Sequence, residues 1–244
     1  MEAANPFNAK QIKHVSLVKE DVDVFVFWTR DPRHILANAD ELTQRGYPFY
    51  VMVTVTGYPE ALEPNQAPVP EVLESMKKLS LKIGQDRVIW RYDPIILSDI
   101  TNNEFHYNNF RKISQDLSGY VNRVIISIYD EYAKAGKRLN ELEREGVLKL
   151  LDMNIGSLTG VLPDIKECAL SANMEIQSCA EKEELLSLGI KPGACIDSGL
   201  LQKICGTEIK GKDKHQRPNC LCCKSIDIGV YKTCEANCVY CYAR

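Results

Sequence analysis

The chain has 244 residues, of which 45% are hydrophobic and 26% are charged, and its formal net charge is -3. These values suit a globular α/β domain, and the slight acidity argues against strong nonspecific binding of nucleic acid. The sequence shows neither a signal-peptide pattern nor an apolar run of the ~18 residues that cross a bilayer. We therefore expect a cytoplasmic protein with no membrane partner.

Short apolar runs rich in β-branched and aromatic residues predict strands, and amphipathic stretches between them predict helices. In chain order the prediction is strand 23–28, helix 32–45, strand 49–56, helix 70–83, strand 87–91, helix 103–117, strand 123–129, helices 139–151 and 163–172, and strand 174–178. Strands that are apolar on both faces and alternate with helices are typical of a parallel sheet. The pattern therefore predicts an α/β fold, either a (β/α) barrel or an open sheet.

Polar residues collect directly after each predicted strand. They are Thr29, Arg30, Asp31, Thr56, Arg91, Tyr92, Asp93, Asp130, Cys179 and Glu181. Parallel α/β folds carry their active sites at this carboxyl edge, so the recurrence indicates a site there. For Asp31 or Asp130 taken alone, a helix N-cap or a strand-end turn is an equally good interpretation.

The cysteines divide the chain into two parts. All 10 lie between Cys168 and Cys241, which is unlike a disulfide framework and points to metal binding. We therefore interpret residues 1–181 as the body of the fold, and residues 182–244 as a cysteine-rich region that completes it and carries the metal sites. A short strand at 225–229 is predicted to lead directly into the last three cysteines.

Cys234, Cys238 and Cys241 form a C-x3-C-x2-C pattern. Three thiolates on one loop suit three irons of a 4Fe-4S cluster and leave the fourth iron without a protein ligand. A structural zinc site is normally closed by four ligands, so zinc here would need a fourth donor from another part of the chain. The pattern favours the cluster over a zinc knuckle.

Several stretches carry a resemblance to known families: residues 5–8, 26–32, 90–95, 179–181, 195–197 and 227–234. Through them the whole chain resembles the domain of unknown function 1848 family. The three-cysteine loop, and more loosely residues 29–32, 63–64 and 93–95, resembles the spore photoproduct lyase-like branch of radical S-adenosylmethionine (SAM) enzymes. Members of the first family are expected to extend further at both ends, so the resemblance implies a shortened, partial TIM-like barrel.

Radical SAM enzymes usually carry the cluster loop after the first barrel strand, whereas the matching strand here comes last. A circular permutation would reconcile the two, because the termini of a barrel are neighbours in space. It requires the predicted strand 225–229 to lie beside strand 23–28 in one sheet.

The resemblance to radical SAM enzymes also implies roles for single residues. Cys234, Cys238 and Cys241 would bind the 4Fe-4S cluster, and SAM would chelate its open iron and be cleaved to a 5'-deoxyadenosyl radical. Arg91, Asp93 and Glu181 are the predicted catalytic residues, and the predicted cofactor-binding residues are Tyr240, Tyr242, Thr29 and Asp130. Packing into the fold is an equally good interpretation of the two tyrosines.

Four further cysteines could form a closed second site, which would hold either an auxiliary 4Fe-4S cluster or a zinc ion. They are Cys179, Cys195, Cys220 and Cys222, and Cys223 could replace either of its neighbours. Cys168 and Cys205 lie at apolar helical positions and are expected to be buried small hydrophobic residues.

The resemblance implies a reductant such as flavodoxin or ferredoxin, and it suggests modified or damaged nucleic acid as the substrate. The competing hypothesis is a noncatalytic zinc- or iron–sulfur-binding protein with a structural or interaction role. The basic run at 210–219 is open to two interpretations, a solvated loop or a phosphate contact, and the first is favoured.

Overall fold

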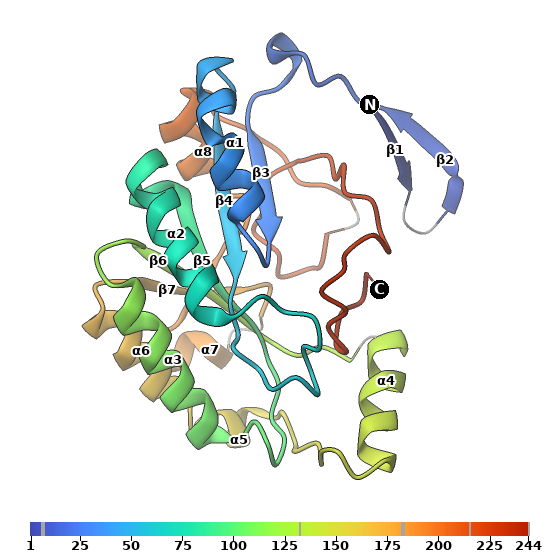
Figure 1. The fold of residues 1–244 in the computed structure, drawn as a ribbon, viewed down its shortest axis with the longest axis vertical. Coiled ribbons are helices and arrows are strands. Elements are labelled where there is room, and N and C mark those ends of the chain that lie inside the picture. The colour runs from blue at the N-terminus through green and yellow to red at the C-terminus, as the bar shows by residue number, and fades with distance from the viewer. Residues whose placement is uncertain (6–7, 132, 182–183, 215, 244) are drawn as a thin grey trace.

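The computed structural model describes residues 1–5, 8–131, 133–181, 184–214 and 216–243 (Figure 1). Its centre is a parallel sheet of six strands in the order β3-β4-β5-β6-β7-β8. The strands are β3 (Phe25–Thr29), β4 (Phe49–Thr54), β5 (Val88–Ile95), β6 (Arg123–Ile128), β7 (Glu175–Cys179) and β8 (Lys191–Gly193). Each strand is added beside the previous one, as in a (β/α) barrel.

Helices cover one face of this sheet. They are α1 (Arg33–Gln44), α2 (Val69–Ile83), α3 (Asn103–Leu117) and α6 (Leu162–Ser171), with the short helices α5 (Ile155–Leu158) and α7 (Glu184–Ser187). Each strand is added on the same side of the previous one, and the crossover between two parallel strands is right-handed. The connecting helices therefore lie on the same face of the sheet. Alternate strand residues, such as Val51, Trp90 and Ile126, pack with them in the larger hydrophobic core.

The cysteine-rich region covers the opposite face of the sheet. Tyr50, Met52, Ile89 and Ile125 point to this side, where they pack with residues of helix α8 (Ser198–Cys205) and with several cysteines. The space that a closed barrel would enclose is therefore filled by the chain's own later residues. We call this side the inner face of the sheet.

Two elements lie away from the sheet. Helix α4 (Ala133–Arg144) stands near the C-terminal end of the chain, and the antiparallel hairpin of β1 (Glu2–Asn5) and β2 (Asn8–His14) projects beyond β3 (Figure 1). Two 3-10 turns, η1 (Lys19–Asp21) and η2 (Gln85–Arg87), precede β3 and β5. None of the described helices is long and apolar enough to span a membrane.

The α/β prediction and the five predicted strands within the first 181 residues are confirmed, with ends shifted by a few residues. Helix 103–117 is confirmed as α3. A closed barrel is not formed by the described strands, because the sheet has two edges, β3 and β8.

The predicted strand at 225–229 is wrong. These residues pair with no strand among the described residues. Asp227 instead accepts hydrogen bonds from the Gly229 amide at 2.8 Å and from the Tyr231 hydroxyl at 3.1 Å, which turn the chain locally. Ile226, one of the two apolar side chains of this run, is exposed. The circular permutation that requires this strand beside β3 is therefore not formed.

The predicted helix at 139–151 is displaced toward the N-terminus, since α4 ends at Arg144. Gly146 follows with a φ of 72°, and the Val147 amide bonds the Leu142 carbonyl at 2.9 Å. This is the usual glycine-dependent end of a helix.

The sequence interpretation missed β1, β2, β8 and α8. Strand β8 has three residues, which is too short for a periodic signal, and its Pro192 suits an edge strand. Helix α8 did have a signal, because Asp197 caps it by accepting from the amides of Gly199 and Leu200.

Candidate functional site

An arginine and a buried carboxylate meet at the carboxyl edge of the sheet. Arg30 follows β3 directly, and its guanidinium donates to Glu63 at 2.5 and 2.9 Å and to the Thr56 hydroxyl at 3.0 Å. Thr56 is fully buried and Glu63 is 5% exposed. Tyr240 closes the group, since its hydroxyl contacts both Arg30 and Glu63. We call these four residues the Arg30 cluster.

The Arg30 cluster anchors the three-cysteine loop. Tyr240 lies between Cys238 and Cys241 in the sequence, and its ring packs edge-on against Tyr58 at 5.8 Å. The Val239 amide donates to the carbonyl of Leu62, in the loop between β4 and α2, at 3.0 Å. The loop is therefore attached at the edge where β3 and β4 end.

Two further side chains hold this loop. Gln66 places an amide nitrogen 3.4 Å from the Cys238 sulfur. Arg138 of α4 donates to the Val239 carbonyl at 2.7 Å and also contacts the Cys241 carbonyl. Cys238 is buried, Cys241 is half-buried and Cys234 is exposed, so the three thiols differ in their access to solvent.

Burial and charge act together on this group. Burial lowers the pKa of Arg30, but the neighbouring Tyr240 and Glu63 outweigh it and raise that pKa above its usual value. Burial is also the main cause of the raised pKa values of Tyr240 and Cys238. Arg30 therefore stays charged, while the Tyr240 hydroxyl stays protonated and donates to Glu63.

Four cysteines from three separate segments of the chain meet on the inner face. The Cys195 thiol lies 3.2 Å from the Cys179 sulfur and also hydrogen-bonds Cys222, which in turn bonds Cys220. The Ile196 amide donates to the Cys222 sulfur at 3.3 Å. The structure thus brings together all four members of the predicted second site. We call them the second cysteine set.

The protonation of the second cysteine set is uneven. Hydrogen bonds from Cys195 and from backbone amides outweigh burial and lower the pKa of Cys222 to about 5. The pKa of Cys195 is raised well above its usual value, because its thiol is the donor to Cys179 and Cys222. The hydrogen bond from Cys195 also lowers the pKa of Cys179, so Cys179 and Cys222 are the members that favour the thiolate form.

Arg91 and Asp93 lie beside the second cysteine set. Arg91 is 8% exposed, donates to the Cys195 sulfur at 3.2 Å and pairs with Asp93. Ser127 of β6 also donates to Asp93. The Nε atom of Arg91 is buried and has no hydrogen-bond partner among the described residues.

Glu181, the third predicted catalytic residue, follows β7. Its carboxylate accepts from the Ile128 amide at 2.8 Å, and burial raises its pKa to about 7. The negative charges of Asp130 and Asp93 are near enough to raise this pKa further. The predicted catalytic residues therefore lie along one edge of the sheet.

Three of the predicted cofactor-binding residues have partners outside the Arg30 cluster. The Thr29 hydroxyl donates to the Asp31 carbonyl at 2.7 Å, which makes it part of a strand-end turn. Asp130 pairs with Arg217 of the basic run at 2.5 Å. Tyr242 is 58% exposed, with its ring 6.5 Å from that of Tyr231. Of the four predicted cofactor-binding residues, Tyr240 alone belongs to the Arg30 cluster.

The remaining cysteines contribute to packing. Cys223 is buried in the inner-face core, and Cys168 packs against the larger core while remaining half-buried. Cys205 is also half-buried, and its thiol bonds the Leu201 carbonyl at 3.0 Å. Full burial was expected for Cys168 and Cys205 and is not observed.

Within the described residues, no group of three or more His, Cys, Asp or Glu side chains is arranged so that it could hold a metal ion. The donor chemistry nevertheless fits. Tetrahedral zinc with bonds of ~2.3 Å places neighbouring sulfurs ~3.8 Å apart, so the sulfurs of Cys195 and Cys179, which are 3.2 Å apart, would have to separate on binding. The three-cysteine loop supplies three thiols and no fourth, as an open cluster needs.

Two cavities lie near the edge but away from the predicted residues. One of about 410 Å³ lies along the start of α3 and is lined by Asn102, Phe105 and Asn109 among others. Another of about 260 Å³ lies between the end of β6 and α4, beside Tyr129 and Leu139. Neither is lined by a predicted site residue.

No catalytic, cofactor-binding or metal-binding role was predicted from the sequence for Arg30, Glu63 or Trp28, although Arg30 was among the polar residues at the strand ends. Arg30 and Glu63 belong to stretches that resemble radical SAM enzymes, so a signal existed for both. Trp28 was taken as a strand residue, yet it is 47% exposed on the inner face.

The fold and these contacts define a class, an open parallel α/β protein whose cysteine-rich segment fills the inner face and whose polar residues gather at the carboxyl edge. The chain belongs to the domain of unknown function (DUF1848) family, which it matches over residues 1–243. No curated protein matches it.

Proposed function

We propose that this protein is a radical SAM-type iron–sulfur enzyme that reductively cleaves S-adenosylmethionine to a 5'-deoxyadenosyl radical. The observation that carries the proposal is the attachment of the three-cysteine loop to the carboxyl edge through Tyr240, Arg30 and Glu63. Parallel α/β enzymes perform their chemistry at this edge. The sequential order of the six strands also supports a relationship to part of a (β/α) barrel.

The cysteines of the loop and the residues that anchor it have separate roles in this proposal. Cys234, Cys238 and Cys241 hold a 4Fe-4S cluster, which when bound supplies the electron and an open iron for SAM. Arg30 and Glu63 are positioning residues, because they act on the loop through the Tyr240 hydroxyl. Burial of Cys238 keeps water away from one side of the loop.

The charged residues on the inner face serve the substrate and the cofactor. Arg91 can donate its unpartnered Nε–H to a carboxylate or a carbonyl. Asp93 keeps Arg91 oriented. Glu181, with its pKa at about 7, can hold or accept a proton near neutral pH. The electron comes from a reductant such as flavodoxin or ferredoxin, and modified or damaged nucleic acid is a proposed substrate class.

A second candidate function, a noncatalytic metal-binding protein, is favoured by the convergence of Cys179, Cys195, Cys220 and Cys222. Four thiols with one pair only 3.2 Å apart suit a single zinc ion better than a 4Fe-4S cluster, which places each thiolate on a different iron. Both hypotheses include this second site, and they differ in what the three-cysteine loop binds.

The direct test is SAM cleavage by the full chain. After anaerobic reconstitution with iron and sulfide and reduction with dithionite, the protein is expected to form 5'-deoxyadenosine from SAM. Cys238→Ser should abolish this product, whereas Cys168→Ser, at a cysteine outside both sets, should form it at a rate near that of the unmodified protein.

The competing hypothesis predicts a different result. A colourless protein that binds zinc alone and leaves SAM intact would overturn the enzymatic proposal. A brown protein that binds an iron–sulfur cluster but does not cleave SAM would also do so, and would support the noncatalytic alternative.

A further inference from the structure

Two thiols lie in contact on the inner face of the sheet. Cys179 is the last residue of β7, and it pairs in register with Gly193, the last residue of the neighbouring strand β8. Cys195 comes two residues after Gly193, and its thiol donates to the Cys179 sulfur at 3.2 Å. Adjacent strands of one sheet therefore bring these two sulfurs together.

The geometry of this pair suits a bond between the two sulfurs. A disulfide bond is ~2.05 Å long, so the sulfurs need to approach each other by about 1.2 Å, which small rotations of both side chains supply. Within the part of the chain that the structure describes, no group of three or more donors is arranged to hold a metal ion. As they stand, Cys179 and Cys195 are arranged to react with each other.

An arginine fixes the position of one of these thiols. Arg91 donates to the Cys195 sulfur at 3.2 Å, and Asp93 pairs with the same guanidinium. Arg91 also lies over the ring of Trp28, with its guanidinium carbon 6.0 Å from the ring centroid. The Cys195 sulfur is therefore held between Arg91 and Cys179.

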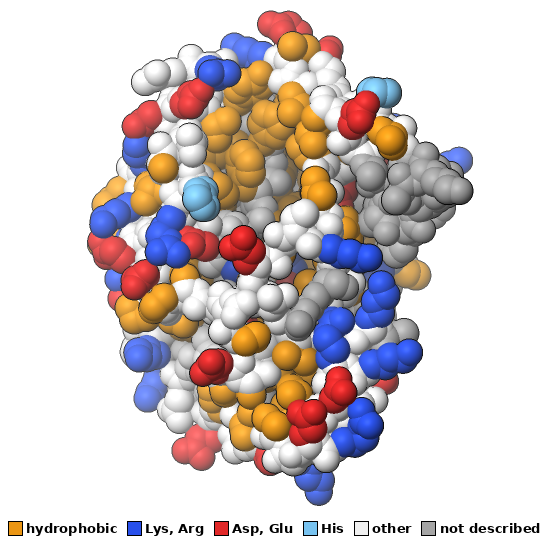
Figure 2. Space-filling model, turned by 45° about the vertical axis from the view of Figure 1, so that its right-hand side comes forward, with side chains coloured by type: hydrophobic (Ala, Val, Ile, Leu, Met, Phe, Trp, Pro, Cys, Tyr) orange, Lys and Arg blue, Asp and Glu red, His pale blue; other side chains and the backbone are white. Residues whose placement is uncertain are grey.

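The inner face is open in part beside this pair. Trp28 is 47% exposed there, and the molecular face in Figure 2 is hollowed in its upper half and carries hydrophobic side chains in the hollow. Cys179 keeps 8% of its surface exposed, and Cys222, which hydrogen-bonds Cys195, is half-buried. A small oxidant can therefore reach the pair, whereas a bulky one cannot.

Contact between the sulfurs and limited access together indicate a redox site. We propose that Cys179 and Cys195 form a reversible disulfide, with hydrogen peroxide as the oxidant. This goes beyond the proposed function, in which the two sulfurs serve only as metal ligands. Because a metal binds thiolates, the disulfide and a metal at the second cysteine set exclude each other.

The reaction has two steps. The Cys179 sulfur loses its proton and attacks one oxygen of the peroxide, so that an S–O bond forms, the O–O bond breaks and the departing hydroxide takes up that proton as water. The Cys195 sulfur then attacks the Cys179 sulfur, so that the S–S bond forms, the S–O bond breaks and the hydroxyl leaves as water with the Cys195 proton. Two thiols are oxidised by two electrons, and the peroxide is reduced to two waters.

The test is mapping of the disulfide in the full chain. Cys168→Ser serves as the background, because trypsin then leaves Cys179 as the one cysteine of peptide 167–182 and Cys195 as the one cysteine of peptide 183–203. The reduced protein is treated with hydrogen peroxide in the presence of a chelator, so that no bound metal protects the thiols. The free thiols are then alkylated before digestion and mass spectrometry.

Peptide 167–182 is expected to be joined to peptide 183–203, about tenfold more often than any other pair of peptides, because the folded protein holds these two thiols in contact. Dithiothreitol should separate the two peptides again. The same treatment in urea should spread the disulfides over many pairs, since the unfolded chain holds no pair together.

Variants distinguish a direct disulfide from a relay. In the same background, Cys195→Ser should lose the joined peptides, whereas Cys222→Ser, at the neighbouring thiol, should keep them. Circular dichroism on each variant separates a loss of the disulfide from a loss of folding.

Four results would each overturn the proposal. They are no joined peptides, a main product that joins either peptide to the Cys220–Cys223 segment, the same product distribution in urea, and loss of the joined peptides in folded Cys222→Ser. Neither SAM nor a cluster enters this assay, so its failure and the failure of the proposed function are separate results.

Discussion

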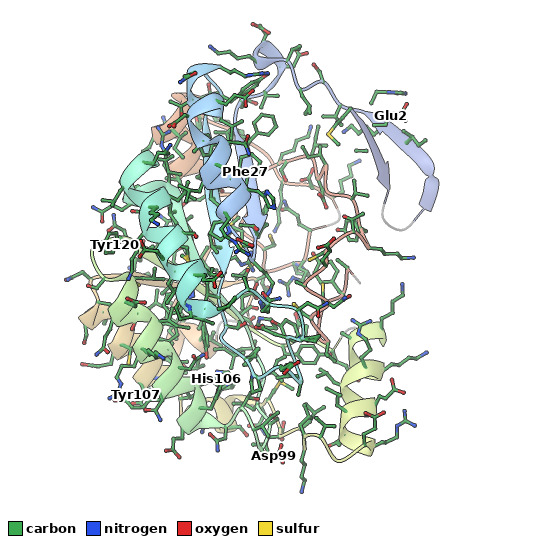
Figure 3. All side chains as sticks on the ribbon, in the orientation of Figure 1. Glu2, Phe27, Asp99, His106, Tyr107 and Tyr120 are labelled. Atoms are coloured by element: carbon green, nitrogen blue, oxygen red, sulfur yellow. The ribbon has the colours of Figure 1, made fainter. Side chains whose placement is uncertain are left out.

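Both ring nitrogens of His106 are hydrogen-bonded inside the protein. Nδ1 lies 2.8 Å from the Tyr92 hydroxyl and Nε2 lies 3.0 Å from the Ile96 carbonyl, where His106 of α3 faces the end of β5 (Figure 3). Tyr92 also accepts from Asn109 at 3.2 Å, so its own proton goes to His106. His106 is therefore held as the neutral form with a proton on Nε2.

This arrangement predicts a loss of stability in acid. Burial lowers the pKa of His106 from 6.5 to about 4. Above the pKa of His106 in the unfolded chain, the imidazole is neutral in both states and the folded protein has its full stability. At lower pH the imidazole binds a proton in the unfolded chain but stays neutral in the folded protein, so unfolding becomes more favourable. Between about pH 7.5 and pH 5 this one residue should remove about 2 kcal/mol of unfolding free energy.

The measurement is urea unfolding at both pH values. His106→Gln keeps a donor for Ile96 and an acceptor for Tyr92 but does not titrate, so its stability should fall less on acidification, by about 2 kcal/mol. His34→Gln, at an exposed position on α1, should keep the pH dependence of the unmodified protein. Identical pH dependence in all three proteins would contradict this account.

Arg30 and Glu63 illustrate how single residues connect distant segments. Glu63 is nearly buried, and its charge is balanced by Arg30, which is 33 residues away in the chain. Tyr240 is a further 177 residues beyond Glu63. A buried carboxylate needs such partners, so the loop between β4 and α2 and the three-cysteine loop depend on the same group.

Helix α8 determines how the inner face is covered. Its Leu200 and Leu201 pack against Tyr50, Met52 and Ile89 in the inner-face core. Its first turn is capped by Asp197, which accepts from the Gly199 amide at 2.8 Å and the Leu200 amide at 3.3 Å. The helix also positions the preceding Cys195 over the sheet, where the Cys195 carbonyl accepts from the Tyr50 hydroxyl at 2.5 Å.

Removal of this cap should loosen the element. Asp197→Ala is expected to lower the unfolding free energy by about 1 kcal/mol for the cap, with a smaller further loss from the ion pair of Asp197 with Arg123 at 2.6 Å. Asp197→Asn loses the same ion pair but keeps a capping acceptor, so it should be clearly more stable than the alanine variant. Equal stability of the two variants in urea would refute the capping role.

Over the whole molecule, seven of the 10 cysteines form two separate groups. The three-cysteine loop lies beside the ends of β3 and β4, whereas the second cysteine set lies beside Arg91 on the inner face. Their different donor sets predict different metals.

We therefore expect about four irons and one zinc per chain after reconstitution. Cys195→Ser should lose the zinc and keep the iron, and Cys238→Ser should do the reverse. Removal of zinc with a chelator should lower the melting temperature, because the set ties β7 to the segment after β8. Elemental analysis that finds about eight irons and no zinc would instead identify a second cluster.

The sequence predicted local structure well wherever a pattern repeats within one element. The five strands of the body and helix α3 follow from apolar runs and periodicity. It failed at 225–229, because alternating Ile226 and Ile228 resemble a strand while Asp227 bonds its own neighbours. It also placed the helix at 139–151, whereas α4 spans Ala133–Arg144.

The sequence by itself determined the α/β class, the polar residues at strand ends, and the cysteine spacing, since all of these depend on residues close together in the chain. Only the tertiary structure decided which cysteines meet, that Arg30 reaches Tyr240 across 210 residues, and that Trp28 stays open beside Arg91. Such contacts result from the packing of whole elements, which no local pattern encodes.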